Sequence, residues 1–291
     1  MKGKYKIKTA VFPIAGMGTR FLPITKTISK EMLNILDRPL IDYAVEEAKE
    51  AGIEKFIFVT NKKNMNPLNY FSKNSNLEKF LKKKRKINLL NQINKLNIKE
   101  KNLIIIHQDK PAGLAHAILK TEKFINKEDF CVILPDDLII GSNCTKELIN
   151  VYNKKITNIL GVMEVEKKDV SKYGIIDISL SKKNNFKIKS MIEKPSIKNS
   201  PSNLAIVGRY ILRNDIFSFI KKIKIGSGGE YQLTDALALS NKYFETWGRK
   251  FKGKRYDCGN KTGFLKAQIA VAFKDKEIKN DMVRFIKSLG E

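Results

Sequence analysis

The most constraining feature of the sequence is the segment Thr9–Lys30, which reads TAVFPIAGMGTRFLPITKTISK. It begins with an apolar run, Ala10–Ile14, whose length and composition predict a buried β-strand. A turn with two glycines follows, and such a turn leaves backbone N–H groups free to face an anion. Arg20 and Lys30 then supply two cations. Together these features predict a cradle for a nucleoside triphosphate.

Other glycine loops explain this segment less well. A dinucleotide-binding fingerprint would need a third glycine at the position of Phe21, and a Walker loop would need Gly-Lys-Ser/Thr at the end of the turn. A simple hairpin turn accounts for the two glycines. It does not account for an arginine directly after the turn or for the later Ser-Lys-Glu.

The pattern GxGTRFLPxTKxxxKEML resembles the signature of the sugar-1-phosphate nucleotidylyltransferases. Its ending, KEML, most resembles the bacterial UTP–glucose-1-phosphate uridylyltransferases (UDP-glucose pyrophosphorylases), whereas thymidylyltransferase relatives usually carry glutamine after the lysine. Asn34 departs from the family, which usually has proline there. The resemblance implies that Arg20 and Lys30 are catalytic. It also implies that the first turn and its flank bind the nucleotide through Ala15, Gly16, Gly18, Thr19 and Glu31.

The order of the following segments predicts an α/β fold. Leu40–Ala51 has the apolar spacing of a helix, and Lys55–Thr60 that of a strand, so strand, helix and strand form a βαβ unit with the ligand beyond the strands' carboxyl ends. The resemblance implies a Rossmann-like, mixed but mostly parallel central sheet flanked by helices, of the nucleotide-diphospho-sugar transferase type. We expect one nucleotidyltransferase domain over residues 1–291. Residues 61–101 are expected to insert two charged amphipathic helices, and residues 262–291 to form a C-terminal helical segment.

The segment after the predicted strand Leu103–Ile106 resembles the base-reading element of the family. The resemblance implies that Gln108 contacts the base and that Gly113 lets the backbone approach it. An amide suits uracil, because it can donate to a carbonyl and accept from a ring N–H. His107 and Ala115 depart from the family pattern, which commonly has arginine and glycine at these positions.

Two aspartates follow the apolar strand Phe130–Leu134. Because side chains alternate along a strand, only one of Asp136 and Asp137 is expected to face the cleft, where a carboxylate would bind Mg²⁺. The resemblance selects Asp136. The block Tyr256–Lys261 is similar to the family's DCGNK motif, which implies that Asp257 is a second Mg²⁺ ligand.

Three later motifs resemble the sugar-binding part of the family. They contain Gly174, the pair Glu193 and Lys194, and Val207. The resemblance assigns Glu193 to the sugar hydroxyls, Lys194 to the sugar phosphate as a catalytic cation, and Gly174 and Val207 to positions beside the sugar. This fits the chemistry, because a carboxylate accepts from hydroxyls and an ammonium offsets a phosphate. Alternation predicts that Glu193 and Lys194 face different sides.

The implied reaction is transfer of the uridylyl group of UTP to α-D-glucose 1-phosphate by direct, Mg²⁺-assisted in-line displacement, which yields UDP-glucose and pyrophosphate. A sister reaction with TTP or CTP remains open. The expected partners are these small molecules and, by analogy with relatives, further copies of the chain in a dimer or tetramer.

The net charge of +26 raises a rival of another class, a basic RNA-binding protein with an inactive nucleotide fold. Nucleic acid is not the expected partner, because lysine is spread along the chain and aromatic residues are not interleaved with the cations. The run Lys82–Lys86 is expected to be a solvated helix face. No stretch of sequence is apolar enough to span a bilayer, and three sparse cysteines favour a reducing, cytoplasmic location.

Overall fold

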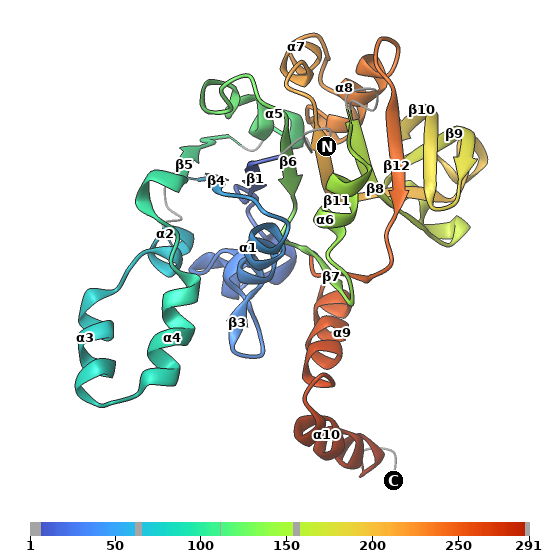
Figure 1. Ribbon diagram of the computed structural model, residues 1–291. Coiled ribbons are helices and arrows are strands. Elements are labelled where there is room, and N and C mark those ends of the chain that lie inside the picture. Colours follow the sequence, from blue (N-terminus) through green and yellow to red (C-terminus); the bar gives the residue numbers. More distant parts are fainter. Residues whose placement is uncertain (1–6, 62–65, 111, 154–157, 289–291) are drawn as a thin grey trace.

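The computed structural model describes residues 7–61, 66–110, 112–153 and 158–288 (Figure 1). In this part of the chain a nine-stranded sheet has the strand order β5-β4-β1-β6-β11-β8-β12-β10-β9. Its strands are β1 (Thr9–Pro13), β4 (Lys55–Thr60), β5 (Leu103–His107), β6 (Phe130–Ile133), β8 (Asn158–Glu164), β9 (Gly174–Lys182), β10 (Asn185–Glu193), β11 (Leu204–Leu212) and β12 (Thr246–Lys250). A separate small pair is formed by β2 (Asn34–Ile35) and β3 (Arg38–Pro39).

The sheet is mixed, as predicted, but parallel pairs do not predominate. The neighbours β5–β4, β4–β1, β1–β6 and β8–β12 are parallel, whereas β6–β11, β11–β8, β12–β10 and β10–β9 are antiparallel. The physical reason lies in the connections. Parallel neighbours need a long crossover, usually a helix, whereas β9 and β10 follow each other closely and can therefore pair as a hairpin.

The second half of the sheet curls back on itself. β9 pairs with β11 as well as with β10, through Ala205 opposite Ile175. The five strands β11, β8, β12, β10 and β9 therefore form a small closed ring. The predicted open, Rossmann-like sheet is therefore found only in the half that contains β5, β4, β1 and β6.

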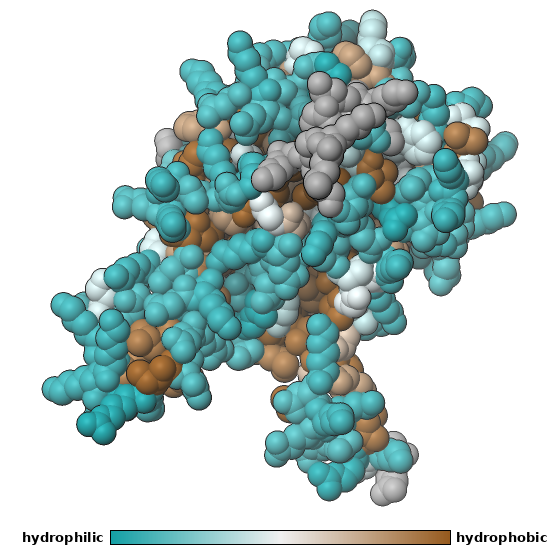
Figure 2. Space-filling view, in the orientation of Figure 1, coloured by the Kyte–Doolittle hydropathy of each residue, from teal (hydrophilic) through white to brown (hydrophobic). Residues whose placement is uncertain are grey.

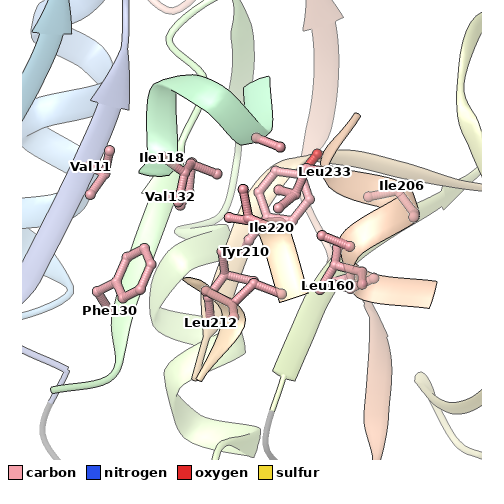
Figure 3. Close-up of a cluster of buried hydrophobic side chains, with 14 of the residues drawn as sticks. Val11, Ile118, Phe130, Val132, Leu160, Ile206, Tyr210, Leu212, Ile220 and Leu233 are labelled. Atoms are coloured by element: carbon pink, nitrogen blue, oxygen red, sulfur yellow. The ribbon is translucent and has the colours of Figure 1, made fainter. Parts of the chain in front are cut away.

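Both faces of the open half are buried. Alternate residues point to opposite cores, so that Val11 and Val132 lie in one cluster and Phe12 and Cys131 in the other. The first cluster is drawn in Figure 3. Burial on both faces explains why these strands are continuous apolar runs in the sequence. The covering helices are α1 (Leu40–Glu50) and α6 (Cys144–Val151) on one face, and α5 (Leu114–Leu119), α7 (Ile216–Ile220) and α8 (Leu233–Ser240) on the other.

Two helical parts extend away from the sheet (Figure 1). The first contains α2 (Asn66–Phe71), α3 (Ser75–Lys83) and α4 (Ile87–Leu96), so three helices are found where two were expected. Figure 2 shows apolar side chains among the hydrophilic surface of the α3–α4 hairpin. The second contains α9 (Lys261–Ala272) and α10 (Lys276–Ser288). The start of the expected insertion, at 62–65, lies outside the described residues.

None of the described helices is both long and apolar enough to cross a membrane. The three cysteines, Cys131, Cys144 and Cys258, are buried free thiols.

Candidate active site

A short ribbon outside the main sheet brings two carboxylates together. β7 (Asp137–Ile140) pairs antiparallel with β13 (Lys254–Asp257), and Asp137 lies opposite Asp257 in the register. The N–H of Cys258 donates to the backbone oxygen of Asp136 at 2.7 Å. Asp136 and Asp257, from distant parts of the chain, therefore lie close together at one end of this ribbon.

The surroundings of Gly259 show how closely this end of the ribbon is packed. A Cβ added there would lie 3.0 Å from Oδ1 of Asp257, 3.3 Å from Oδ2 of Asp136 and 3.6 Å from Nη1 of Arg20. Arg20 also donates to the backbone oxygen of Gly259 at 3.2 Å. The glycine is therefore surrounded by both carboxylates and a guanidinium.

This donor set fits Mg²⁺, which typically binds one or two carboxylates together with water and substrate phosphates. Within the described residues, no cluster of three or more His, Cys, Asp or Glu side chains could hold a metal. Asp136 and Asp257 would therefore supply only part of the coordination, and the remaining ligands would come from water and substrate oxygens.

Lys30 forms an ion pair with Asp136. Its Nζ donates to Oδ2 of Asp136 at 2.5 Å. Burial would lower the pKa of Lys30, but the Asp136 and Glu31 carboxylates raise it above its usual range. Burial would raise the pKa of Asp136, but the Lys30 ammonium holds it below its usual range. Both groups are therefore charged near neutral pH.

Glu31 lies next to Lys30 and is only 1 % exposed. Its Oε1 is 3.7 Å from Nζ of Lys30, and its Oε2 has no hydrogen-bond partner within the described structure. Burial raises the pKa of Glu31 to about 7, although Lys30 acts in the opposite direction. The structure thus places this side chain beside the catalytic candidate and not in the open cavity.

Asp137 points away from Asp136. Its Oδ2 accepts from the N–H of Gly208 at 2.6 Å, and its Oδ1 accepts from Nε of Arg255 at 2.6 Å. Asp137 therefore connects β11 to β13 and is 6 % exposed. Only one of the two aspartates was expected to face the cleft, but both line the cavity beside them; their carboxylates nevertheless have different partners.

A cavity of about 1340 Å³ lies beside this turn. It brings together most of the residues predicted to act on phosphates, metal and sugar. Lys30 is linked to it through the bond to Asp136. The predicted residues that line the cavity are Arg20, Asp136, Gly174, Glu193, Lys194 and Asp257.

Glu193 and Lys194 both face this cavity, contrary to the expected alternation. Lys194 has a φ of 46°, so the chain leaves the extended conformation directly after β10. The Nζ of Lys194 consequently lies 3.6 Å from Oε1 of Glu193. The other Glu193 oxygen, Oε2, accepts from Oγ1 of Thr234 at 2.6 Å.

Gly174 and Val207 have different surroundings. A Cβ on Gly174 would lie 2.8 Å from Oγ1 of Thr234 and 3.2 Å from Oε2 of Glu193, so Gly174 belongs to the cavity wall. The Val207 side chain is 2 % exposed and packs in the hydrophobic core. The structure does not bring this side chain to the cavity.

The predicted nucleotide-binding residues lie at the strand ends of the parallel half. Gly16 would place a Cβ 3.7 Å from Cε of Lys30. Gln108 follows β5, donates from its backbone N–H to Thr60 and is 4 % exposed. Its side-chain Nε2 lies 2.7 Å from Nδ1 of His116. The whole predicted nucleotide-binding set lies outside the lining of the described cavity: Ala15, Gly16, Gly18, Thr19, Glu31, Gln108 and Gly113.

Gly113 joins this group to the cavity. Its φ is 98°, and a Cβ there would lie 2.6 Å from the backbone oxygen of Tyr231. The N–H of Tyr231 donates to Ala112, and the N–H of Ala115 donates to Tyr231. The structural reason for glycine here is therefore the close approach of the 230–232 loop, part of which lines the cavity.

Sequence reasoning missed Arg255 and gave Thr234 no role, although both line the cavity. Arg255 donates to Asp137, and its Nη1 lies 3.0 Å from the Tyr173 hydroxyl. A signal was present, because Arg255 is two residues before Asp257 and alternate residues of a strand share a face.

Fold and site together define the class of protein: the chain belongs to the nucleotidyl transferase family, whose family model matches residues 11–273. It is 42% identical over 287 residues to UTP–glucose-1-phosphate uridylyltransferase 1 of Staphylococcus saprophyticus, covering 98% of this chain and 100% of the relative. The corresponding uridylyltransferase of Staphylococcus epidermidis is 41% identical over 285 residues, covering 98% and 99%. The resemblance stated from the sequence is thereby confirmed.

Two solved structures are also similar. A UDP-glucose pyrophosphorylase complexed with UDP-glucose has a TM-score of 0.85 and 42% identity, covering 93% of this chain and 100% of that chain. A UTP-bound UGPase from Acinetobacter baumannii has a TM-score of 0.87 and 36% identity, covering 98% and 100%.

Proposed function

We propose that this protein transfers the uridylyl group of UTP to α-D-glucose 1-phosphate, giving UDP-glucose and pyrophosphate. The observation that carries the proposal is one cavity lined by Arg20, Asp136, Lys194 and Asp257, with Lys30 bonded to Asp136. The names of the relatives and the ligands of the two solved structures support the choice of uridylyl transfer and glucose.

The chemical problem is the mutual repulsion of two polyanions. An oxygen of the acceptor phosphate must approach the α-phosphorus of UTP while charge develops on the departing pyrophosphate. Fixed cations and positioning supply most of the catalysis in such a reaction. No side-chain nucleophile is required, because the acceptor phosphate is already ionised near neutral pH.

Each cation has a place in this scheme. Arg20, beside Gly259, holds the pyrophosphate end of UTP. Lys30 offsets charge at the transferred phosphate, and its ion pair with Asp136 keeps it charged and oriented. Lys194, which lines the cavity, holds the acceptor phosphate; it lies next to Glu193, which accepts from sugar hydroxyls.

We propose Mg²⁺ as the cofactor, with Asp136 and Asp257 as its protein ligands. When bound, the ion neutralises phosphate charge and polarises the phosphoryl group that is attacked. The facing of both carboxylates toward Gly259 supports this assignment.

Base recognition is proposed to rest on Gln108. Its contact with His116 leaves Oε1 of the amide as the acceptor for the ring N–H of uracil. Backbone groups of Ala15, Gly16, Gly18 and Thr19 are proposed to line the path of the nucleotide.

We further propose that residues 1–291 form one nucleotidyltransferase domain, with a helical insertion at 61–101 and a helical segment at 262–291. The match of the family model to 11–273 supports a single domain. A homo-oligomer remains a proposal by analogy with relatives. A cytoplasmic location is supported by the three free thiols.

A pyrophosphate-release assay tests the function. The four nucleoside triphosphates are combined with several sugar 1-phosphates, with and without Mg²⁺. We expect release to be fastest with UTP and glucose 1-phosphate and to be abolished by chelation of the metal. Faster release with TTP or CTP would instead establish a sister enzyme. Binding of random RNA at about 0.15 M salt, without pyrophosphate release in any mixture, would support the RNA-binding rival.

A further inference from the structure

Arg209, on β11, is the largest of the fully buried side chains of the described structure and is 2 % exposed. It does not line the cavity. A buried guanidinium is costly unless each of its donors is matched. Its hydrogen bonds therefore indicate what the fold gains by keeping it.

The guanidinium of Arg209 donates hydrogen bonds to the backbone on both sides of the turn that carries Asp136. Nη1 donates to the backbone oxygen of Leu134 at 3.0 Å, and Nη2 donates to that of Asp137 at 2.9 Å. Nη1 also donates to the oxygen of Gly208 at 3.0 Å. The carbonyls immediately before and after Pro135-Asp136 are thus held by one rigid, planar group.

The charge of this group is balanced from α1. Glu47 accepts from Nε of Arg209 at 3.0 and 3.1 Å and from Nη2 at 2.8 Å. Glu47 also accepts from the N–H of Thr145 at 2.8 Å and from its hydroxyl at 2.7 Å. Burial would raise the pKa of Glu47, but Arg209 and Thr145 hold it below its usual range.

We propose that Arg209 and Glu47 are positioning residues that fix the Asp136 carboxylate relative to Asp257. The inference rests on the proposed function, because it assigns a task to the turn that would hold the metal. A lysine could neutralise Glu47 but could not reach three carbonyl oxygens with a planar fork. Groups that orient metal ligands from behind typically change metal affinity or activity by about 10- to 100-fold.

The test compares Arg209→Lys with Thr145→Val in the full chain. Thr145→Val removes a hydroxyl donor to Glu47 on the side away from the turn, so it weakens the same buried pair without freeing the two carbonyls. Hydrogen exchange is measured at the amides of Asp137 and Cys258, which donate to Leu134 and Asp136. The Mg²⁺ concentration for half-maximal activity is measured in parallel.

We expect Arg209→Lys to speed exchange at these amides, and to raise the Mg²⁺ requirement, by about tenfold or more. Thr145→Val should leave both within about twofold of the wild type, even where the two variants are equally destabilised toward urea. Equal behaviour of the two variants would show that the pair has only a structural role and would overturn the proposal.

If Arg209→Lys does not fold, Glu47→Gln replaces it, since the amide still accepts one bond; unchanged exchange at Asp137 and Cys258 would then overturn the proposal. If the wild type releases no pyrophosphate, the proposed function fails, and the exchange comparison still decides whether Arg209 holds the turn.

Discussion

Asp136 and Asp137 are adjacent but have opposite tasks. Asp136 faces Lys30 and the cavity, whereas both oxygens of Asp137 are occupied by Gly208 and Arg255. The Asp137 carboxylate therefore connects β11 to β13, whereas the Asp136 carboxylate is the one proposed to bind Mg²⁺. The hydrogen bonds of a carboxylate thus distinguish one that has a structural role beside a site from one that is available to a ligand.

Asp257→Asn should lower kcat at least about 100-fold, because it removes one of two anionic ligands where phosphate charge develops. The control is Asp281→Asn on α10, where the side chain is 74% exposed, and this variant should keep its activity. Rates are measured across a Mg²⁺ titration. Near-normal turnover of Asp257→Asn would remove Asp257 from the proposed site.

Lys194→Ala should raise the KM for glucose 1-phosphate by about tenfold or more, since a hydrogen bond to a charged group contributes roughly 1.5–3 kcal/mol. The KM for UTP should change far less. Lys189→Ala, on β10 with a 67% exposed side chain, serves as the control. Steady-state kinetics with each substrate varied would contradict the assignment if both KM values rose equally.

Glu31 predicts a pH dependence of stability. Burial raises its pKa from 4.5 to about 7. The contribution of Glu31 to the unfolding free energy is therefore fully present below about pH 4.5 and is lost as the pH rises through 7. Glu31→Gln removes the titration. Between about pH 5 and 8 the unfolding free energy of the wild type should fall, relative to this variant, by at most about 3 kcal/mol.

Urea unfolding at the two pH values measures this difference. Glu277→Gln, at an exposed position of α10, should track the wild type at both. A constant difference between wild type and Glu31→Gln across the range would show that Glu31 does not titrate there.

At the scale of elements, the sequence was most informative where strands are buried on both faces. The predicted strand Lys55–Thr60 matches β4 at both ends, because a nearly continuous apolar run leaves little choice. The short helix α2 was missed, since six residues hold too little periodicity, although Pro67 at its second position is a helix-start signal.

The sequence did not allow us to predict which strands of the sheet pair with each other. The ring closes through Ala205 opposite Ile175, and nothing local in either strand encodes that contact. The cations and carboxylates of the candidate site were carried over by resemblance, and six of the predicted residues line one cavity. The resemblance did not show that the Val207 side chain is in the core or that Lys194 leaves the strand with a positive φ.

Two glycines allow the docking of the 230–232 loop to be measured. Gly113→Ala places a methyl group 2.6 Å from the Tyr231 oxygen, whereas Gly141→Ala, at a similar φ of 94°, meets nothing within 4 Å. Both variants place a side chain at a positive φ, which carries backbone strain of roughly 1–3 kcal/mol. Gly113→Ala should cost at least about 1 kcal/mol more, by analogy with overpacked cores, and should lower kcat/KM for UTP.

Urea unfolding and steady-state kinetics check this pair. Equal losses of stability in both variants, with unchanged kinetics in Gly113→Ala, would mean that the loop tolerates displacement from Gly113.

For the whole molecule, the net charge of +26 acts on encounter more than on fold. Both substrates are anions, so the positive field should speed their capture at low salt. We expect kcat/KM for UTP to fall several-fold between about 0.02 and 0.3 M KCl, with kcat nearly constant, because the Debye length shortens over this range. A salt-independent kcat/KM, at constant free Mg²⁺, would exclude steering.

The place of β12 between β8 and β10 has a consequence for synthesis on the ribosome. Both neighbours emerge long before β12, and Asp257 emerges later still. A nascent chain therefore carries two unpaired strand edges until β12 has been translated, and such edges invite association with other chains. Chaperone demand should concentrate in that interval, and chains that terminate before β12 should be both inactive and prone to aggregate.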